Sequence, residues 1–192
     1  FQSCSSLTSL EISDSVNGIG KAAFSYCSSL TSVTIPDSVT TIDEGAFQSC
    51  DLYTVIVGNS VTTIKQNAFI IKNTSTRTNL YFRGNAPVIE SGTFANKIYY
   101  TLYVYDTATG WDAYKSSYTI KTLHIITFNS SGGSAVEAQE VISGQKATQP
   151  DAPAKEGHVF VGWYEDADFN SPWSFSNAVT SSKTLYAKWF AG

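Results

Sequence analysis

Three cysteines are the residues of this chain whose type and spacing first indicate chemistry. Cys4, Cys27 and Cys50 recur every 23 residues, and three thiols could bind a metal or form one disulfide beside a free thiol. A zinc site needs a fourth ligand, and the two histidines, His124 and His158, lie far along the chain. Because the spacing is regular, we expect instead a buried ladder of three slowly reacting thiols.

Two further motifs imitate ligand sites. Residues 18–23 fit the loose dinucleotide fingerprint G-x-G-x-x-A, which cradles a pyrophosphate only between a strand and a helix. The same positions differ in the next two repeats, so we expect no nucleotide cofactor there. The run 166–170, Asp-Ala-Asp-Phe-Asn, resembles the start of a calcium loop, but Ser171 and Asn177 replace the glycine and glutamate that an EF-hand needs. We therefore favour a polar turn over a metal site.

No set of acids, bases and nucleophiles in the sequence is persuasive as a catalytic site. The adjacent carboxylates at 43–44 and 165–166 fall at expected turns, where solvated charge is their ordinary role. Twelve basic against sixteen acidic residues give a net charge of -4, without a basic cluster for a phosphate backbone. The apolar runs are too short to span a membrane. We expect no enzyme, no cofactor, no nucleic-acid partner and no membrane span here.

The elements that position these residues come from an internal repeat. Units 4–26, 27–49 and 50–71 each carry an apolar ladder with the spacing L-x-x-L-x-L, then a second apolar pair, then Ala-Phe. The ladders are Leu7, Leu10 and Ile12; Leu30, Val33 and Ile35; and Leu52, Val55 and Val57. Such a period is typical of a solenoid whose strands direct alternate side chains inward. We expect a mainly β leucine-rich-repeat solenoid with about 22 to 25 residues per repeat.

Later units should continue and close this solenoid. A fourth, longer unit has its turn at 84–87, and a fifth strand follows it. Their apolar residues are Leu80, Phe82, Ile89 and Phe94, followed by Leu102 and Val104. Beyond them, residues 107–115 offer Thr109 as the N-cap of a short amphipathic cap that carries Trp111 and Tyr114. The first unit lacks a covering neighbour, so we expect an open, sticky end there.

The run 27–42, with Ala-Phe closing each turn, resembles the BspA-like leucine-rich repeats of bacterial surface proteins. It reads Cys-Ser-Ser-Leu-Thr-Ser-Val-Thr-Ile-Pro-Asp-Ser-Val-Thr-Thr-Ile, and the resemblance covers about residues 1–122. The resemblance implies a cell-surface or secreted adhesion or interaction protein, often modular, without catalytic residues.

After Leu123 the 23-residue period stops and a second module begins. We expect strands at 124–128, 136–141, 158–164 and 184–189 around an aromatic core. A set of glycines, prolines and aromatic residues in this module resembles a Listeria-Bacteroides repeat, which is similar to the internalin B-repeat. The set consists of Thr127-Phe128, Gly132-Gly133, Gly144, Pro150, Pro153, Gly157, residues 160–164, Trp173, Phe175 and residues 185–189. The resemblance covers about 123–190 and implies a small β-grasp-like module on extracellular bacterial proteins. We therefore assign 1–122 to the solenoid and 123–192 to this module.

The outward positions of the solenoid strands form the candidate interaction surface. Beside the core ladder lie Glu11, Thr34, Ile56, Tyr81 and Tyr103, and one step further lie Ser13, Pro36, Gly58, Arg83 and Tyr105. Tyrosine and arginine anchor interfaces because they combine a large contact area with a polar tip. We expect Tyr81, Arg83, Tyr103 and Tyr105 to bind a protein or glycan. In the alternative interpretation, the tyrosines pack against the cap or the second module.

Together these patterns predict a C-terminal fragment of a larger extracellular or cell-wall-associated bacterial protein. Its expected role is adhesion to a host or neighbouring cell through a protein or glycan. Two alternatives stay open. The modules could form a structural stalk of a larger surface protein, or they could be ancillary modules of an extracellular hydrolase.

Overall fold

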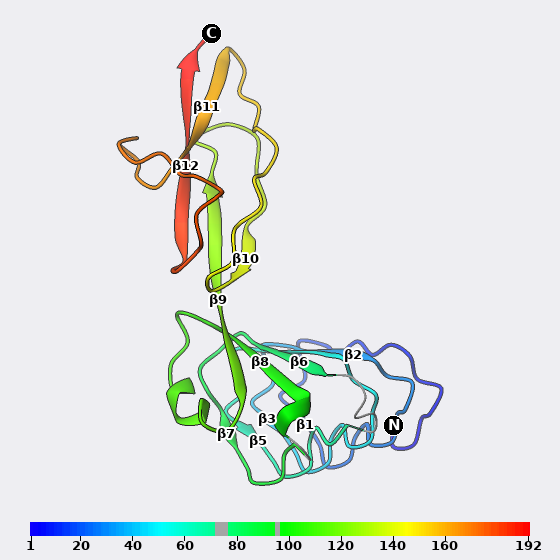
Figure 1. Cartoon of the computed structure of the whole chain (residues 1–192). Helices are drawn as coiled ribbons and strands as arrows, with labels where there is room; N and C mark the ends of the chain where they lie inside the picture. Colours follow the sequence, from blue (N-terminus) through cyan, green and yellow to red (C-terminus); the bar gives the residue numbers. More distant parts are fainter. Residues whose placement is uncertain (72–76, 95–96) are drawn as a thin grey trace. The chain divides into compact units, whose positions relative to one another are not determined.

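A computed structural model of the chain describes residues 1–71, 77–94 and 97–192 (Figure 1). The chain divides into two compact units, residues 1–121 and 122–192. Strands dominate both units, and the only regular helices in the described residues are two short 3-10 turns. The mainly β fold class is therefore confirmed.

One side of the first unit is a parallel sheet formed by one strand from each successive turn. In spatial order its strands are β2 (Ser32–Ile35), β4 (Thr54–Val57), β6 (Thr78–Phe82) and β8 (Tyr100–Tyr105). The register places equivalent repeat positions side by side, so Val33 pairs with Val55 and Val55 pairs with Leu80. Along β2 and β4 every second residue is buried, because successive side chains of a strand point to opposite faces. The predicted leucine-rich-repeat solenoid is confirmed.

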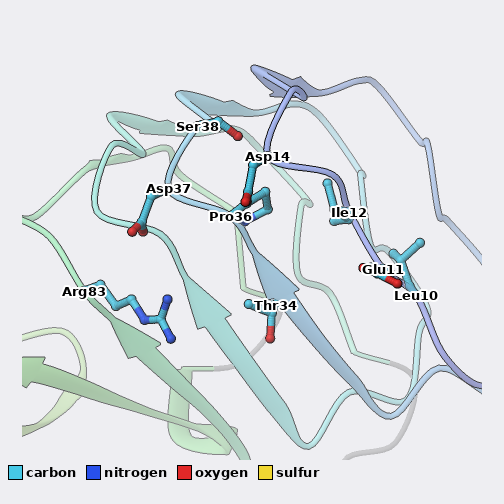
Figure 2. A pocket seen from close by; sticks show the side chains of 9 residues that line it. All are labelled: Leu10, Glu11, Ile12, Asp14, Thr34, Pro36, Asp37, Ser38 and Arg83. Atoms are coloured by element: carbon cyan, nitrogen blue, oxygen red, sulfur yellow. The ribbon is translucent and has the colours of Figure 1, made fainter.

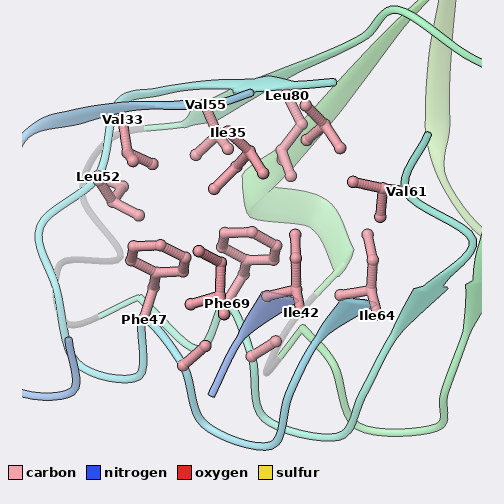
Figure 3. Close-up of a cluster of buried hydrophobic side chains, with 14 of the residues drawn as sticks. Val33, Ile35, Ile42, Phe47, Leu52, Val55, Val61, Ile64, Phe69 and Leu80 are labelled. Carbon is pink, nitrogen blue, oxygen red and sulfur yellow. The ribbon is translucent and has the colours of Figure 1, made fainter. Parts of the chain in front are cut away.

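A second row of shorter strands forms the other side of the solenoid. It consists of β1 (Gly18–Ile19), β3 (Thr41–Ile42), β5 (Thr63–Ile64) and β7 (Val88–Ile89), which also pair in parallel. Side chains from the two sheets converge on one core, as Figure 3 shows for Val55 and Leu80 on one side and Ile42 and Ile64 on the other. Stacking of the turns therefore buries a continuous apolar interior.

A ladder of phenylalanine rings runs through this interior from turn to turn. Its members are Phe1, Phe24, Phe47, Phe69 and Phe94. Neighbouring ring centroids are 5.3 to 6.1 Å apart, and the ring planes differ by only 2° to 14°. Four of these rings close an expected turn, so the stack is the three-dimensional form of the repeated Phe in the sequence. Each inner ring contacts the turn before it and the turn after it.

The C-terminal end of the solenoid is closed by aromatic residues with polar tips. The Tyr100 hydroxyl donates to the Phe69 carbonyl oxygen at 2.7 Å and accepts the Ile71 N–H at 3.3 Å. In the same way, the Tyr114 hydroxyl donates to the Pro87 carbonyl oxygen at 2.9 Å. These bonds satisfy backbone groups that the last turns would otherwise bury without partners. The predicted cap does pack on the core.

The start of that cap differs from the prediction. The helix is a single 3-10 turn, η2 (Trp111–Tyr114), and its N-cap is Gly110, which has a φ of 84° and makes no side-chain capping bond. Thr109 instead uses its backbone, because its N–H donates to Asn85 and its carbonyl accepts the Ala86 N–H. The expectation of Thr109 as N-cap was wrong, because a left-handed glycine makes the entry into the turn. A second 3-10 turn, η1 (Lys97–Tyr99), precedes β8.

The opposite end of the solenoid is open, as the sequence predicted. Phe1 is 78% exposed, and the ladder residues Leu7, Leu10 and Ile12 are only partly buried, whereas their equivalents in the next turn, from Leu30 on, are fully inside. A hollow of about 380 Å³ at this end is lined mainly by apolar side chains of the first turn. No turn of this chain covers them.

The second unit has a mixed sheet with strand order β10-β9-β12-β11. Its strands are β9 (Thr119–Asn129), whose first three residues belong to the first unit, β10 (Gln139–Ile142), β11 (His158–Tyr164) and β12 (Lys183–Ala191). β9 and β12 are parallel, and both outer pairs are antiparallel. Its core includes Phe128, Trp163 and Leu185. The second strand was expected at 136–141, but β10 begins only at Gln139, so residues 136–138 lie outside it. Residues 122–192, all of which are described, contain no helix. The β-grasp-like fold stays a prediction.

Candidate binding face of the solenoid

Two of the four predicted site residues meet as a stacked pair. Tyr81 on β6 and Tyr103 on β8 are direct partners in the parallel register, so both side chains point out of the same sheet face. Their ring centroids are 4.6 Å apart, and the ring planes differ by 11°. This stack gives the outward face a flat aromatic surface. Such a surface supplies contact area with little loss of side-chain entropy.

The two tyrosines of the stack differ in their exposure. Only 9% of Tyr103 is exposed, whereas Tyr81 is half-buried. One ring face of Tyr103 is covered by Tyr81, and the Lys121 ammonium lies 5.6 Å from the Tyr103 ring centroid. Tyr103 therefore supports the Tyr81 ring from the side, and Tyr81 is the member of the pair that a ligand can reach.

The other two predicted residues continue the same strands. Arg83 lies two residues beyond Tyr81, and Tyr105 lies two residues beyond Tyr103, so all four share the outward face. Arg83 is exposed, whereas Tyr105 is half-buried. Arg83 lines a hollow on this face, but Tyr105 does not.

The hollow has a volume of about 610 Å³ and collects polar side chains from three turns (Figure 2). Its lining residues are Leu10, Glu11, Ile12, Asp14, Thr34, Pro36, Asp37, Ser38 and Arg83. Sequence reasoning did not select Glu11, Asp14 or Asp37 as site residues. A signal was present, because Asp14 and Asp37 occupy the same repeat position before Ser-Val.

A glycine in the third turn allows a close approach to the turn before it. Gly58 follows β4 in the row of outward positions between Pro36 and Arg83. A Cβ at Gly58 would lie only 2.4 Å from the Pro36 carbonyl oxygen, so no side chain fits there. Glycine is therefore the residue that this close approach of two turns requires. Figure 2 shows the Arg83 side chain extending toward Thr34 on the same face.

The charged groups of the hollow are not paired with each other. Elsewhere on the solenoid, Lys21 and Glu44 form an ion pair at 2.7 Å, and Lys65 pairs with Asp43 at 3.1 Å. Within the described residues, the side chains of Glu11, Asp14 and Arg83 make no hydrogen bond or ion pair. Asp37 accepts the Asn59 N–H at 2.8 Å. The hollow thus offers a guanidinium donor and carboxylate acceptors to an incoming molecule.

The three cysteines are free thiols, as expected, and two of them are fully buried. The Cys27 thiol donates to the Phe1 carbonyl oxygen at 3.2 Å, and the Cys50 thiol donates to the Phe24 carbonyl oxygen at 3.1 Å. Burial raises the pKa of the Cys50 thiol to about 12 and also raises that of Cys27. The expectation of three buried thiols was wrong for Cys4, which is partly exposed because no turn covers it.

The two motifs that imitate ligand sites are structural elements. Gly18 begins the short strand β1, and the chain then enters a turn rather than a helix. The Asp166 carboxylate accepts the backbone N–H groups of Asn170 at 3.1 Å and Ser171 at 2.8 Å, which holds the pKa of Asp166 below its usual value. Both carboxylate oxygens therefore serve the loop itself, and this run is the predicted polar turn. Among the described residues, no group of three or more His, Cys, Asp or Glu side chains is placed to hold a metal ion.

Comparison with known proteins agrees with this architecture. Residues 1–130 match the family model described as the BspA type leucine rich repeat region, in six copies, and residues 124–188 match the Listeria-Bacteroides repeat domain. A protein of Evansella cellulosilytica, provisionally named a Gly-rich membrane protein, is 43% identical over 67 residues, which are 34% of this chain and 8% of the relative. A second, provisionally named a membrane protein, is 41% identical over 68 residues, which are 35% of this chain and 10% of the relative.

The regions that match this chain make up a tenth or less of the length of each of those two relatives. Within the described residues, no helix is both long and apolar enough to cross a membrane. The family match covers more than half of the chain, and the stacked parallel turns are those of a leucine-rich-repeat solenoid. The chain therefore belongs to the family of BspA-type leucine-rich-repeat proteins and carries a Listeria-Bacteroides repeat domain after the solenoid.

Proposed function

We propose that this chain is a non-catalytic adhesion module of an extracellular or cell-wall-associated bacterial protein. Its outward sheet face binds a protein or glycan of a host or neighbouring cell. The observation that carries this proposal is the Tyr81–Tyr103 stack, which places a flat aromatic surface beside the exposed Arg83. Tyrosine and arginine side chains of this kind dominate the binding energy of many interfaces.

The rigidity of the face supports the proposal. β6 lies between β4 and β8 in the sheet, and the residues that alternate with the outward ones, Leu80, Phe82 and Leu102, are buried in the core. A ligand that contacts Tyr81 and Arg83 therefore does not have to order the backbone beneath them, which lowers the entropic cost of binding. The surface-type repeat architecture and the membrane-protein names of the two relatives fit the same location.

The groups on this face suit binding better than bond cleavage. Hydrolysis would need an acid and a base held on either side of a reacting bond. The outward residues around the stack are instead tyrosines and Arg83, which are residue types that anchor interfaces. An ancillary role beside a separate catalytic domain is compatible with this face.

A binding screen tests the proposal directly. Purified chain is passed over immobilised mucins, extracellular-matrix proteins and a glycan panel, with Tyr81→Ala as the test variant. Tyr26→Ala is the matched control, because Tyr26 is also an exposed tyrosine but lies on a turn outside the sheet. We expect saturable binding that weakens at least about tenfold in Tyr81→Ala, as for an interface hot spot, and stays unchanged in Tyr26→Ala. Circular dichroism checks that both variants are folded.

Two outcomes contradict the proposal. Equal binding by Tyr81→Ala and the wild type would mean that the tyrosine pair is not the contact surface. A folded chain that binds nothing in the screen would favour the structural stalk. Tyr103 is a poor test residue on its own, because its buried ring supports both the fold and the ring of Tyr81.

A further inference from the structure

The hollow beside the tyrosine pair has the size and chemistry of a small-ligand site. Its volume of about 610 Å³ lies within the roughly 300 to 1,000 Å³ of ordinary ligand pockets. It lies on the outward face used by the proposed adhesion function, since Arg83 belongs to both. The residues that form it come from the first, second and fourth turns, so only the folded solenoid assembles it.

The hollow presents hydrogen-bonding groups of both kinds. The Arg83 guanidinium carries five N–H donors, whereas Glu11 and Asp14 carry only acceptors. None of these three side chains has a partner among the described residues. The hydroxyl groups of Thr34 and Ser38 complete the lining, and they can donate or accept. Vicinal hydroxyl groups of a sugar likewise donate and accept at once, so they can satisfy both sets.

Apolar surface accompanies these polar groups. Leu10, Ile12 and Pro36 contribute to the lining, and the Tyr81 ring lies on the same face two residues before Arg83. A pyranose ring has a C–H face that packs on flat apolar or aromatic surfaces while its edge carries the hydroxyl groups. The pairing of an apolar wall with unsatisfied donors and acceptors matches that amphipathic shape.

We propose that this hollow binds a neutral oligosaccharide. Charge decides the class of sugar: three carboxylates, Glu11, Asp14 and Asp37, surround one guanidinium, so a uronic or sialic acid would be repelled on balance. The same net charge would attract a basic peptide, which is therefore the competing ligand that the test includes. A neutral polyol uses donors and acceptors without bringing a charge of its own. The inference rests on the proposed adhesion function and names the ligand for that face.

Isothermal titration calorimetry of the full chain tests this inference with defined probes. The neutral probes are chitotetraose, cellotetraose, maltotetraose and lacto-N-tetraose. The anionic probe is 3′-sialyllactose, and the cationic probe is a lysine-rich decapeptide. We expect at least one neutral tetrasaccharide to bind with an affinity that hardly changes with ionic strength, because no net charge is screened.

Two variants locate the binding in the hollow. Arg83→Gln and Asp14→Asn remove a charged donor and a charged acceptor from exposed positions, so the fold should be unaffected. Each should weaken the neutral sugar about tenfold, as expected for the loss of a hydrogen bond to a charged group. The control Lys21→Gln removes an exposed charge of the same solenoid that does not line the hollow, and it should leave the affinity unchanged.

The possible failures are distinguishable from each other. If no neutral tetrasaccharide binds, or if binding persists unchanged in both variants, the inference is overturned. Salt-sensitive binding of the lysine-rich peptide in place of sugars overturns the ligand class but leaves an interaction face. Protein binding that depends on Tyr81 but not on Arg83 would also leave the adhesion function standing while refuting the sugar site. If the Tyr81 screen and the sugar titrations both fail, the adhesion proposal fails with this inference.

Discussion

Replacement of Phe47 tests whether the phenylalanine ladder holds the turns of the solenoid together. Phe47 is fully buried, and its ring stacks on Phe24 at 5.3 Å and on Phe69 at 5.5 Å. Phe47→Ala removes both contacts and leaves a cavity, which should lower the free energy of unfolding by about 3 to 5 kcal/mol. Phe47→Leu keeps most of the apolar burial and loses two aromatic contacts worth about 0.5 to 1.5 kcal/mol each, so about 1 to 3 kcal/mol.

Phe1→Ala is the matched control, because it is the same substitution at the exposed end of the same ladder. Phe1 is 78% exposed and stacks only on Phe24, at 5.7 Å. One aromatic contact with little burial should be worth below about 1.5 kcal/mol. The expected order of destabilisation is therefore Phe47→Ala, then Phe47→Leu, then Phe1→Ala.

Hydrogen exchange measured by mass spectrometry is the appropriate assay, because the chain has two compact units and one unfolding curve would mix them. Peptides from residues 1–71 report the stability of the solenoid, and peptides from 122–192 serve as an internal control. Equal loss of protection in Phe47→Ala and Phe1→Ala would refute the reasoning. Uniform loss of protection that extends into residues 122–192 would show that the ladder does not act within the solenoid alone.

Three further predictions concern the closure, packing and thiols of the solenoid. Tyr100→Phe removes a buried hydroxyl that bonds two backbone groups, and it should lower the unfolding free energy of the solenoid, measured by hydrogen exchange, by about 1 to 3 kcal/mol. Gly58→Ala places a Cβ 2.4 Å from a backbone oxygen and should lower the unfolding free energy by about 1 to 3 kcal/mol in the same assay. The control Gly20→Ala, whose Cβ would have no atom within 4 Å, should change the unfolding free energy by less than about 0.5 kcal/mol. Equal effects of the two substitutions would contradict the crowding at Gly58. Burial raises the pKa of Cys50 to about 12, so the folded chain retains a proton that the unfolded chain loses, and stability should fall as pH rises from the ordinary thiol pKa toward 12. Ellman's reagent should label Cys4 well before Cys50 in the folded state, and simultaneous labelling would contradict the buried positions.

Much of the fold could be predicted because one period encodes both strand register and core. The equivalence of Val33, Val55 and Leu80 in the sequence became direct pairing of β2, β4 and β6. The repeated Ala-Phe predicted which residues close each turn, and stacking of identical turns then places their rings in one ladder. Errors arose where the period ends. Thr109 looked like a helix cap, but the terminal turn is entered through Gly110.

The candidate site was only partly predictable. Alternation along the strands correctly placed Tyr81 and Arg83 on the outward face. The exposure of an outward residue depends on its neighbours, however. Tyr103 is covered by the Tyr81 ring of the adjacent strand β6 and lies near a lysine 18 residues further along the chain. The roles of Asp14 and Asp37 were missed for a related reason, because each looks like an ordinary turn aspartate until Arg83 is placed opposite them.

The sequence by itself therefore determined the solenoid, its inward residues and its repeat, because the period obliges each turn to bury the same positions against its neighbours. Only the tertiary structure decided which outward residues a ligand can reach. Residues 14, 37 and 83 come together because parallel stacking brings distant turns within a few strand spacings of each other. A pattern read along the chain records which residues face outward, whereas burial and shared hollows arise from neighbours that only the fold supplies.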